Sequence, residues 1–339
     1  MIRVGFDISQ LAHLGGVNTY TKNLTEELSK IEDLEMVYFY SSLRQPYKGN
    51  LKGVKSYRLP PTLFEVLFNK IRSVPIEKFV GSVDVFHSSD WVQPPTRAKK
   101  VTTVHDAVAL KYPQWSHPKI VQVHKRRLKL IEEEVDIVIA VSSATKKDLL
   151  EVSKIPSEKI YVVYEGPTAD FKIQPKQKVE EFGKKYNLPK EFVLAISGVG
   201  ERRNIERIRQ ASSGYPLIVT GEDIPWLGVE ELELLYQSAS VLVYASLYEG
   251  FGIPILDAFL NHLPVITSNI SSMPEVAGEG AVLVDPLKVD DIKAKIKMVM
   301  EDAKLREELI EKGIKQASNF SWKKAAQETV EIYRQLKGI

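Results

Sequence analysis

The stretch Glu249-Gly250-Phe251-Gly252-Ile253-Pro254-Ile255-Leu256-Asp257 marks the turn from a strand into a helix. The apolar residues 241–245 before it predict a buried strand, and Pro254 suits the first turn of a helix, where a missing N–H costs nothing. A carboxylate therefore stands at the carboxyl end of a strand, where open α/β sheets bind ligands. The helix start attracts phosphate, so the stretch fits a ligand with hydroxyls and phosphate, such as a nucleotide sugar. The alternative is that both acids only favour the helix N-terminus electrostatically.

The length, composition and charge of the chain exclude several classes of protein. A chain of 339 residues with 44% hydrophobic residues suits two globular domains. A net charge of +2 implies no general polyanion partner, and the absence of cysteine excludes disulfides, thiolate nucleophiles and Cys-ligated metals. No apolar run approaches the ~20 residues of a membrane span, and no secretory leader is visible. We expect a cytoplasmic protein, with peripheral contact at the inner membrane face left open.

Strand-like and helical patterns alternate along the chain, which predicts parallel sheets connected by right-handed crossovers. In the first half the expected strands are residues 2–7, 35–40, 83–87, 101–105, 135–141 and 159–164, with helices at 16–28, 120–134 and 142–152. Residues 166–190 are rich in proline and charge and predict a linker with one short helix. Alternation then restarts, with strands at 192–196, 216–220, 241–245, 264–267 and 280–284 and helices at 204–211, 232–238, 253–260, 289–301, 303–317 and 322–336.

Polar residues follow the first strand of each half. Arg202 and Arg203 come after a glycine turn and could hold phosphate oxygens in pairs, although a solvated charged turn is the alternative. A third glycine at dinucleotide-fingerprint spacing is absent, which argues against a Rossmann cofactor. In the first half, Gly15-Gly16 opens a helix and could approach a phosphate, or could be a plain loop.

His105-Asp106 ends another predicted strand. The imidazole could act as a base or contact a substrate hydroxyl, or it could be structural. A basic helix at residues 120–134 could lie on a membrane or present a solvated face. The sequence contains no Asp-x-Asp pair and no i, i+4 histidine pair, so metal binding is unsupported.

Taken together, these motifs resemble those of the retaining, GT-B-fold glycosyltransferases of family 4, the group 1 glycosyltransferases, and are most similar to bacterial mannosyltransferase-like members. The resemblance covers nearly the whole chain and includes a glycine loop, a histidine motif, a strand-to-serine motif, a phosphate motif and a paired-acid signature. These are residues 15–24, 103–106 with 112–115, 139–143, 201–205 and 248–259.

The resemblance implies a role for each matching position. Arg203, flanked by Arg202 and Asn204, would neutralise the diphosphate of the donor. Glu249 would bind hydroxyls of the donor sugar. His105 would contact the reacting sugar, so the implied catalytic residues are His105, Glu249 and Arg203.

The remaining implied contacts come mainly from the backbone. Gly250, Phe251 and Gly252 would offer N–H groups to sugar or phosphate, and Gly16 would approach the phosphates from across a cleft. Asp257 would hold the ribose, at a position where the family usually has Glu. Likewise Arg203 replaces the usual Lys, and Glu165-Gly166 replaces a common Asn-Gly.

We therefore expect an α/β protein of GT-B type, with two Rossmann-like αβα domains and a cleft between them. Residues 1–166 would form the acceptor domain, 167–190 a linker, 191–319 the donor domain, and 320–339 a C-terminal helix that packs back on the first domain. The expected enzyme is a metal-independent, retaining hexosyltransferase that uses a nucleotide sugar and a glycan or lipid-linked acceptor, with mannose as the suggested sugar. No cofactor, nucleic acid or obligate protein partner is implied.

Two alternatives stay open: a nucleotide-sugar epimerase of the same architecture, and a degenerate protein that binds nucleotide sugars without turnover. The segment of residues 208–230 is shorter than usual in the family, so a strand or helix of the second sheet could be missing and nucleobase recognition altered. The donor sugar, nucleobase, acceptor and oligomeric state are not encoded in recognisable motifs.

Overall fold

The computed structural model describes residues 1–13, 15–88, 91–198 and 200–339. The chain forms two compact units. The first comprises Met1–Glu165 and Ser321–Ile339, and the second comprises Gly166–Phe320. The residues predicted as a linker, 167–190, thus belong to the second unit, where they include the short helix α7 (Lys176–Lys185).

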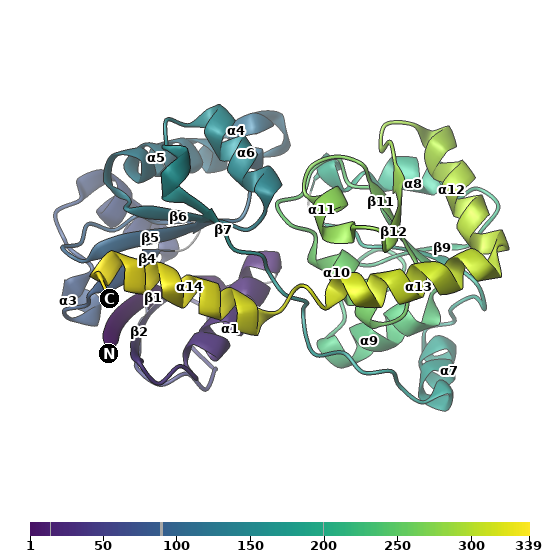
Figure 1. The fold of residues 1–339 in the computed structure, drawn as a ribbon, viewed down its shortest axis with the longest axis horizontal. Coiled ribbons are helices and arrows are strands. Elements are labelled where there is room, and N and C mark those ends of the chain that lie inside the picture. The colour runs from purple at the N-terminus through teal and green to yellow at the C-terminus, as the bar shows by residue number, and fades with distance from the viewer. Residues whose placement is uncertain (14, 89–90, 199) are drawn as a thin grey trace. The chain divides into compact units, whose positions relative to one another are not determined.

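The first unit is built on a seven-stranded sheet with the order β3-β2-β1-β4-β5-β6-β7 (Figure 1). Every neighbouring pair is parallel. The first six strands have the 3-2-1-4-5-6 order of Rossmann-like folds. The strands are β1 (Ile2–Asp7), β2 (Leu34–Ser41), β3 (Val54–Tyr57), β4 (Val85–Ser88), β5 (Lys99–Val104), β6 (Ile137–Ala140) and β7 (Ile160–Val162).

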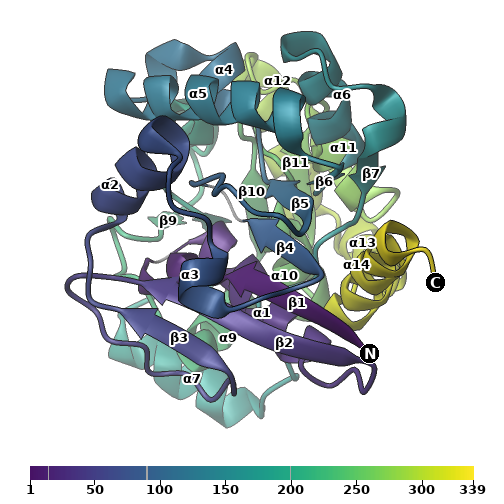
Figure 2. The same cartoon turned by 90° about the vertical axis from the view of Figure 1, so that its left-hand side faces the viewer.

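Helices cover both faces of this sheet, as right-handed crossovers require when strand order reverses at β1. Figure 2 shows α4, α5 and α6 together on one side, and α1 with α14 on the other. The helices are α1 (Gly16–Leu28), α2 (Pro61–Phe64), α3 (Glu77–Val80), α4 (Val108–Lys111), α5 (Pro118–Glu134), α6 (Ser143–Val152) and α14 (Trp322–Lys337). Short turns complete the unit: η1 (Ser9–Ala12), η2 (Glu65–Ile71, a π-helix), η3 (Pro113–Trp115) and η4 (Ser157–Lys159).

The second unit has a five-stranded parallel sheet with the order β12-β11-β10-β8-β9. Its strands are β8 (Val193–Ala195), β9 (Leu217–Val219), β10 (Val241–Tyr244), β11 (Val265–Ser268) and β12 (Ala281–Val284). Its other helices are η5 (Glu201–Arg203), α8 (Ile205–Ala211), α9 (Val229–Ser238), α10 (Ile253–Leu260), α11 (Met273–Ala277), α12 (Val289–Glu301) and α13 (Ala303–Ala317). After β9, only an isolated bridge between Thr220 and Ile224 extends the sheet, in the segment that the sequence identified as short.

Helix α10 is fixed by a close approach to α13. A Cβ at Gly313 would lie 2.5 Å from the Phe259 ring, closer than real Cβ contacts. Glycine at this position therefore lets the two helices pack together and holds the start of α10 at the sheet edge. The bounds of α10, α12 and α13 are those predicted from the sequence.

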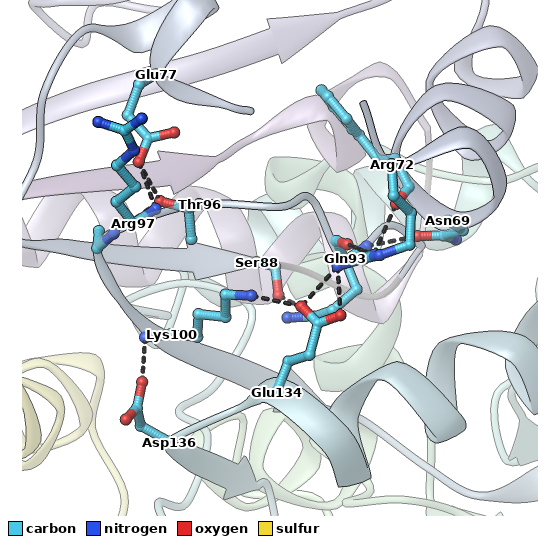
Figure 3. A network of polar contacts seen from close by, with 12 residues as sticks. Asn69, Arg72, Glu77, Ser88, Gln93, Thr96, Arg97, Lys100, Glu134 and Asp136 are labelled. Carbon is cyan, nitrogen blue, oxygen red and sulfur yellow. Dashed lines mark hydrogen bonds and ion pairs between the residues drawn. The ribbon is translucent and has the colours of Figure 1, made fainter. Parts of the chain in front are cut away.

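A polar network joins the helices and strands of the first unit (Figure 3). The Glu134 carboxylate, at the end of α5, binds Arg72 Nη2 at 2.5 and 2.6 Å and Lys100 Nζ at 2.5 Å. Arg72 Nη1 also donates to Gln93 O at 3.0 Å, and Gln93 N donates to Asn69 Oδ1 at 2.7 Å. The loop after β4 is thereby tied to both η2 and α5.

The C-terminal helix is anchored by a buried histidine. His87 on β4 lies 2.6 Å from the Tyr333 hydroxyl through Nδ1, and 2.8 Å from Thr103 Oγ1 through Nε2. Burial, with a contribution from nearby His105, lowers the pKa of His87 to about 3. The neutral ring therefore connects α14 to β4 and β5, and Figure 1 shows α14 (yellow) lying beside α1 and β1.

Replacing Tyr333 with Phe tests this anchor. The change leaves His87 Nδ1 buried without its hydroxyl partner, which costs about 1–3 kcal/mol of unfolding free energy. The control is Tyr161→Phe, which removes an exposed hydroxyl that bonds Gln335 of the same helix and should change stability by less than about 0.5 kcal/mol. Urea unfolding of both variants measures the difference, and equal stabilities would show that the buried contact contributes nothing.

Candidate functional site

The loops that follow three neighbouring strands of the second sheet lie together at the carboxyl ends of these strands. Because all strands are parallel, the loops after β8, β9 and β10 leave at the same edge. The loops after β8 and β10 are joined directly, since Leu247 N donates to Arg202 O at 2.7 Å. The predicted arginine turn and the predicted paired acids are thus brought together at the edge where α/β sheets bind ligands.

Glu249 is the buried anion of this edge. The residue is 6% exposed, and a carboxylate at such a position needs a charged partner to offset lost hydration. Arg203 Nη1 lies 2.5 Å from Glu249 Oε1, and Arg202 Nη1 lies 3.8 Å from Oε2. The sequence placed these residues in one site, and the structure adds that they pair with each other.

Neighbouring residues fix the position of the Arg203 side chain. Its Nη1 also donates to the Tyr244 hydroxyl at the end of β10, and burial raises the pKa of that tyrosine. A Cβ at Gly198 would lie 2.7 Å from Arg203 Nε. Gly198 therefore leaves the space in which the guanidinium reaches Glu249.

The turn into α10 has a fixed backbone. Gly252 is the N-cap with φ +112°, a conformation that favours glycine. Ser272 Oγ donates to Glu249 O at 3.0 Å and to Phe251 O at 2.7 Å. The Phe251 side chain is buried against Phe320, so any ligand contact of Phe251 comes from its backbone, as it does for Gly250 and Gly252.

Asn204 performs a structural task at the same edge. Its Nδ2 donates to Ala245 O at 2.8 Å and to Pro286 O at 2.7 Å, while its Oδ1 accepts from Arg207 at 2.9 Å. The buried amide thereby joins the end of β10 to the loop after β12. The side-chain amide of Asn204 therefore holds the loops of the site together. A hydrogen bond from this amide to a donor substrate would need the same Nδ2 and Oδ1 atoms.

Asp257 faces the chain rather than solvent. It is 2% exposed, and it accepts hydrogen bonds from Thr168 N at 2.8 Å and Thr168 Oγ1 at 2.6 Å. Burial raises the pKa of Asp257 to about 7, although both bonds from Thr168 act in the opposite direction. This carboxyl fixes the segment that begins the second unit to α10, a partner that sequence patterns did not indicate.

His105 and Glu165 form the candidate site of the first unit. His105 is 9% exposed, and its Nδ1 lies 3.1 Å from Glu165 Oε1, across a separation of 60 residues. Tyr20 packs edge-on against the imidazole at 4.5 Å between ring centroids. Among the described residues, the buried His105 Nε2 has no hydrogen-bond partner.

A carboxylate at Nδ1 orients the ring and leaves Nε2 for a ligand. The sequence singled out His105 but not Glu165, which stood only as a departure from a family pattern. Gly16 is the first residue of α1 and is exposed, after Gly15 with φ +120°.

Helix α5 shows a mixed basic surface. Arg127 points inward, where its Nη2 donates to Thr102 Oγ1 at 2.9 Å and Thr103 O at 2.8 Å. Arg126 pairs with the Glu65 carboxylate, whereas Lys125 and Lys129 are exposed. The predicted basic face is therefore only partly available to a membrane.

In the described ranges, no helix is both long and apolar enough to span a bilayer, and no three potential metal-ligating side chains gather in one place.

Two family models match overlapping parts of the chain. The model described as Glycosyltransferase Family 4 matches residues 14–170, and the model described as Glycosyl transferases group 1 matches residues 149–316. Among curated proteins, the O-antigen chain mannosyltransferase B of Escherichia coli is 28% identical over 371 residues, which cover 95% of this chain and 97% of that protein.

Solved structures share the fold at low identity. Sucrose-phosphate synthase from Thermosynechococcus elongatus has a TM-score of 0.79 at 19% identity, with 100% of both chains covered. HepE from Anabaena, in complex with UDP and glucose, has a TM-score of 0.73 at 14% identity over 99% of this chain and 100% of its own. The predicted GT-B fold class, two α/β domains with parallel sheets, is confirmed.

The pKa of Asp257 gives a stability prediction. Between the ordinary value of 3.8 and about 7, the folded chain keeps a proton that the unfolded chain has released. Raising the pH across this interval should therefore destabilise the wild type relative to Asp257→Asn, by up to about 1.4 kcal/mol per pH unit. Urea unfolding from pH 4 to pH 8 measures the difference, with exposed Asp170→Asn as the control. Parallel curves for wild type and Asp257→Asn would contradict the raised pKa.

Proposed function

Because the chain belongs to the GT-B glycosyltransferases of group 1 and family 4, we propose that it transfers a hexose from a nucleotide-sugar donor to a hydroxyl acceptor. The suggested sugar is mannose, and the suggested acceptor is a glycan or a lipid-linked saccharide. Transfer retains the anomeric configuration and requires neither a metal ion nor a resident cofactor. The observation that carries the proposal is the pair of Arg203 and Glu249 at the carboxyl edge of the second sheet.

Support for mannose comes from a relative. The similar Escherichia coli protein is named an O-antigen chain mannosyltransferase, and the match extends over nearly the full length of both chains. A glycan acceptor follows from the same name. The Anabaena neighbour was solved with UDP and glucose, which supports a nucleotide-linked donor without selecting the sugar.

The chemistry requires positive charge where the leaving diphosphate forms. Arg203 and Arg202 supply two guanidinium groups beside Glu249, and fork-shaped guanidinium groups match phosphate oxygens. In the ligand-free arrangement, Glu249 neutralises Arg203. A diphosphate would take over the guanidinium contacts, and the carboxylate would then accept hydrogen bonds from sugar hydroxyls. Groups held in place before the reaction stabilise developing charge without further reorganisation.

His105 is the proposed contribution of the first unit. With Nδ1–H donated to Glu165, a neutral imidazole presents Nε2 as an acceptor for a sugar hydroxyl. A protonated imidazole would present a donor with a carboxylate behind it. In both states Glu165 sets the direction of the ring, so it acts as a positioning residue.

Turnover of candidate donors tests the function. With a glycan acceptor whose hydroxyl takes up the sugar, the purified chain should release nucleoside diphosphate from a nucleotide sugar. GDP-mannose is tested first, UDP-sugars are tested beside it, and EDTA is present throughout. Glu249→Gln should lower kcat/KM by about 10²–10³-fold, because a preorganised contact made in the transition state is lost. Glu279→Gln, which changes an exposed acid of the same unit outside the motifs, should keep wild-type turnover. Full activity of Glu249→Gln would refute the assigned role, and a strict need for divalent metal would refute metal independence.

Replacing Glu165 tests the positioning of His105. Glu165→Ala leaves Nδ1 without its partner and should lower kcat on the order of ten- to a hundredfold, by analogy with the range found for residues that orient metal-binding histidines. The donor KM should change little, because Glu165 itself does not contact the donor. Glu165→Gln should recover most of the loss, since its amide oxygen accepts the same bond, and exposed Glu158→Ala serves as control. Wild-type kcat in Glu165→Ala would exclude the role.

A further inference from the structure

We propose that Trp226 is the stacking platform for the nucleobase of the donor. This inference rests on the proposed function, because it assigns a residue to the base of a nucleotide-sugar ligand. Trp226 is 62% exposed, and every other phenylalanine, tyrosine and tryptophan that the structure describes is buried or half-buried. Burying the surface of a large aromatic ring is favourable, and rings stack on other flat groups, so an exposed tryptophan on an ordered support is suited to bind a flat ligand.

The backbone under the ring is ordered and specific. A Cβ at Gly221 would lie 2.9 Å from the Cε2 and Cζ2 atoms of Trp226, so the indole rests against this glycine. Gly221 has φ +79°, which favours glycine on a second ground. The ring is therefore supported by backbone while most of its surface stays open to solvent.

The turn of residues 221–224, two residues before Trp226, is tight. Gly221 N donates to Ile224 O at 2.6 Å, and Asp223 Oδ2 accepts from Val219 N at 2.8 Å. The Ile224 side chain is buried, which anchors the turn in the core. Little conformational entropy remains to be lost when a flat ligand stacks on the ring.

The turn also lies at the edge that holds the candidate phosphate-binding arginines. It follows β9, which pairs in parallel with β8, and Ser197 N after β8 donates to Thr220 Oγ1 at 3.1 Å. Arg203 reaches Tyr244 of β10, on the opposite side of β8. Two strand spacings separate β9 from β10, or roughly 10 Å. In a nucleoside diphosphate the ribose separates the base from the diphosphate over a comparable length, so one ligand can reach both features.

Stacking does not depend on the hydrogen-bond donors and acceptors of the base, because every base has a π-face. Trp226 would therefore supply affinity for the base, and purines would overlap the indole more than pyrimidines. A nucleobase site assembled this way fits a segment too short for a full additional strand, since only the Thr220–Ile224 bridge extends the sheet there.

Binding measurements with ligands that have or lack a base test the proposal. Isothermal titration of the full chain with GDP, UDP and pyrophosphate gives three dissociation constants for the wild type and for Trp226→Ala, Trp226→Leu and Trp226→Phe. We expect Trp226→Ala and Trp226→Leu to weaken GDP binding roughly ten- to a hundredfold. Trp226→Phe keeps a π-face and should bind GDP nearly as tightly as the wild type. Pyrophosphate affinity should be the same in all four proteins. GDP should also quench the intrinsic tryptophan fluorescence of the wild type, and pyrophosphate should not.

The outcomes separate this inference from the proposed function. If the wild type binds GDP but Trp226→Ala binds it equally well, the platform is refuted while the donor site stands. If Trp226→Leu binds GDP as tightly as the wild type and Trp226→Ala does not, apolar bulk rather than stacking explains the effect, and the proposal also fails. If no nucleotide binds the wild type, both the proposed function and this inference are overturned. Thermal melting of each variant confirms that the fold is intact.

Discussion

A carboxylate buried at the edge of a parallel sheet must be paired, and this constraint organises the second unit. Glu249 has lost most of its hydration, and Arg203 supplies the compensating charge from the loop after a neighbouring strand. That pairing requires glycine at position 198, a fixed turn into α10 and a bond between the two loops. An ion pair of this kind rarely adds stability over apolar packing. Under the proposed function, the pair holds a guanidinium where a ligand with more negative charge would replace the carboxylate.

Other buried polar groups hold segments of the chain in position. Asp257 fixes the start of the second unit through Thr168, and His87 fixes the C-terminal helix through Tyr333. Glu165 fixes His105. In the first two cases every contact of the group is satisfied within the chain, whereas His105 keeps one buried nitrogen without a partner among the described residues. That difference separates a structural histidine from one suited to a substrate.

Local sequence patterns predicted the elements whose signals are local. The bounds of α10, α12 and α13 follow from a proline in the first turn, acidic first-turn residues and the Asp302 cap. The strand β3 was missed because its residues are polar and half-exposed, and the π-helix η2 was missed because its geometry depends on the network around Glu134. The sequence also brought the arginine turn and the paired acids to one sheet edge, because parallel strands place successive loops together.

Pairings between distant positions could not be read from the sequence. Nothing local connects Glu165 to His105, Thr168 to Asp257, or Asn204 to Pro286. These contacts arise from tertiary packing, and they decide which polar residues remain for a ligand. Asp257 and Asn204 were singled out as ligand contacts from motif position alone, and the structure shows both occupied by bonds within the chain.

In the proposed mechanism, a nucleoside diphosphate replaces Glu249 as the partner of Arg203. A crystal structure of the chain with the nucleoside diphosphate that binds most tightly tests it directly. We expect diphosphate oxygens on the Arg203 guanidinium, with the ion pair to Glu249 opened. A nucleotide bound elsewhere, with Arg203 still paired to Glu249, would contradict it.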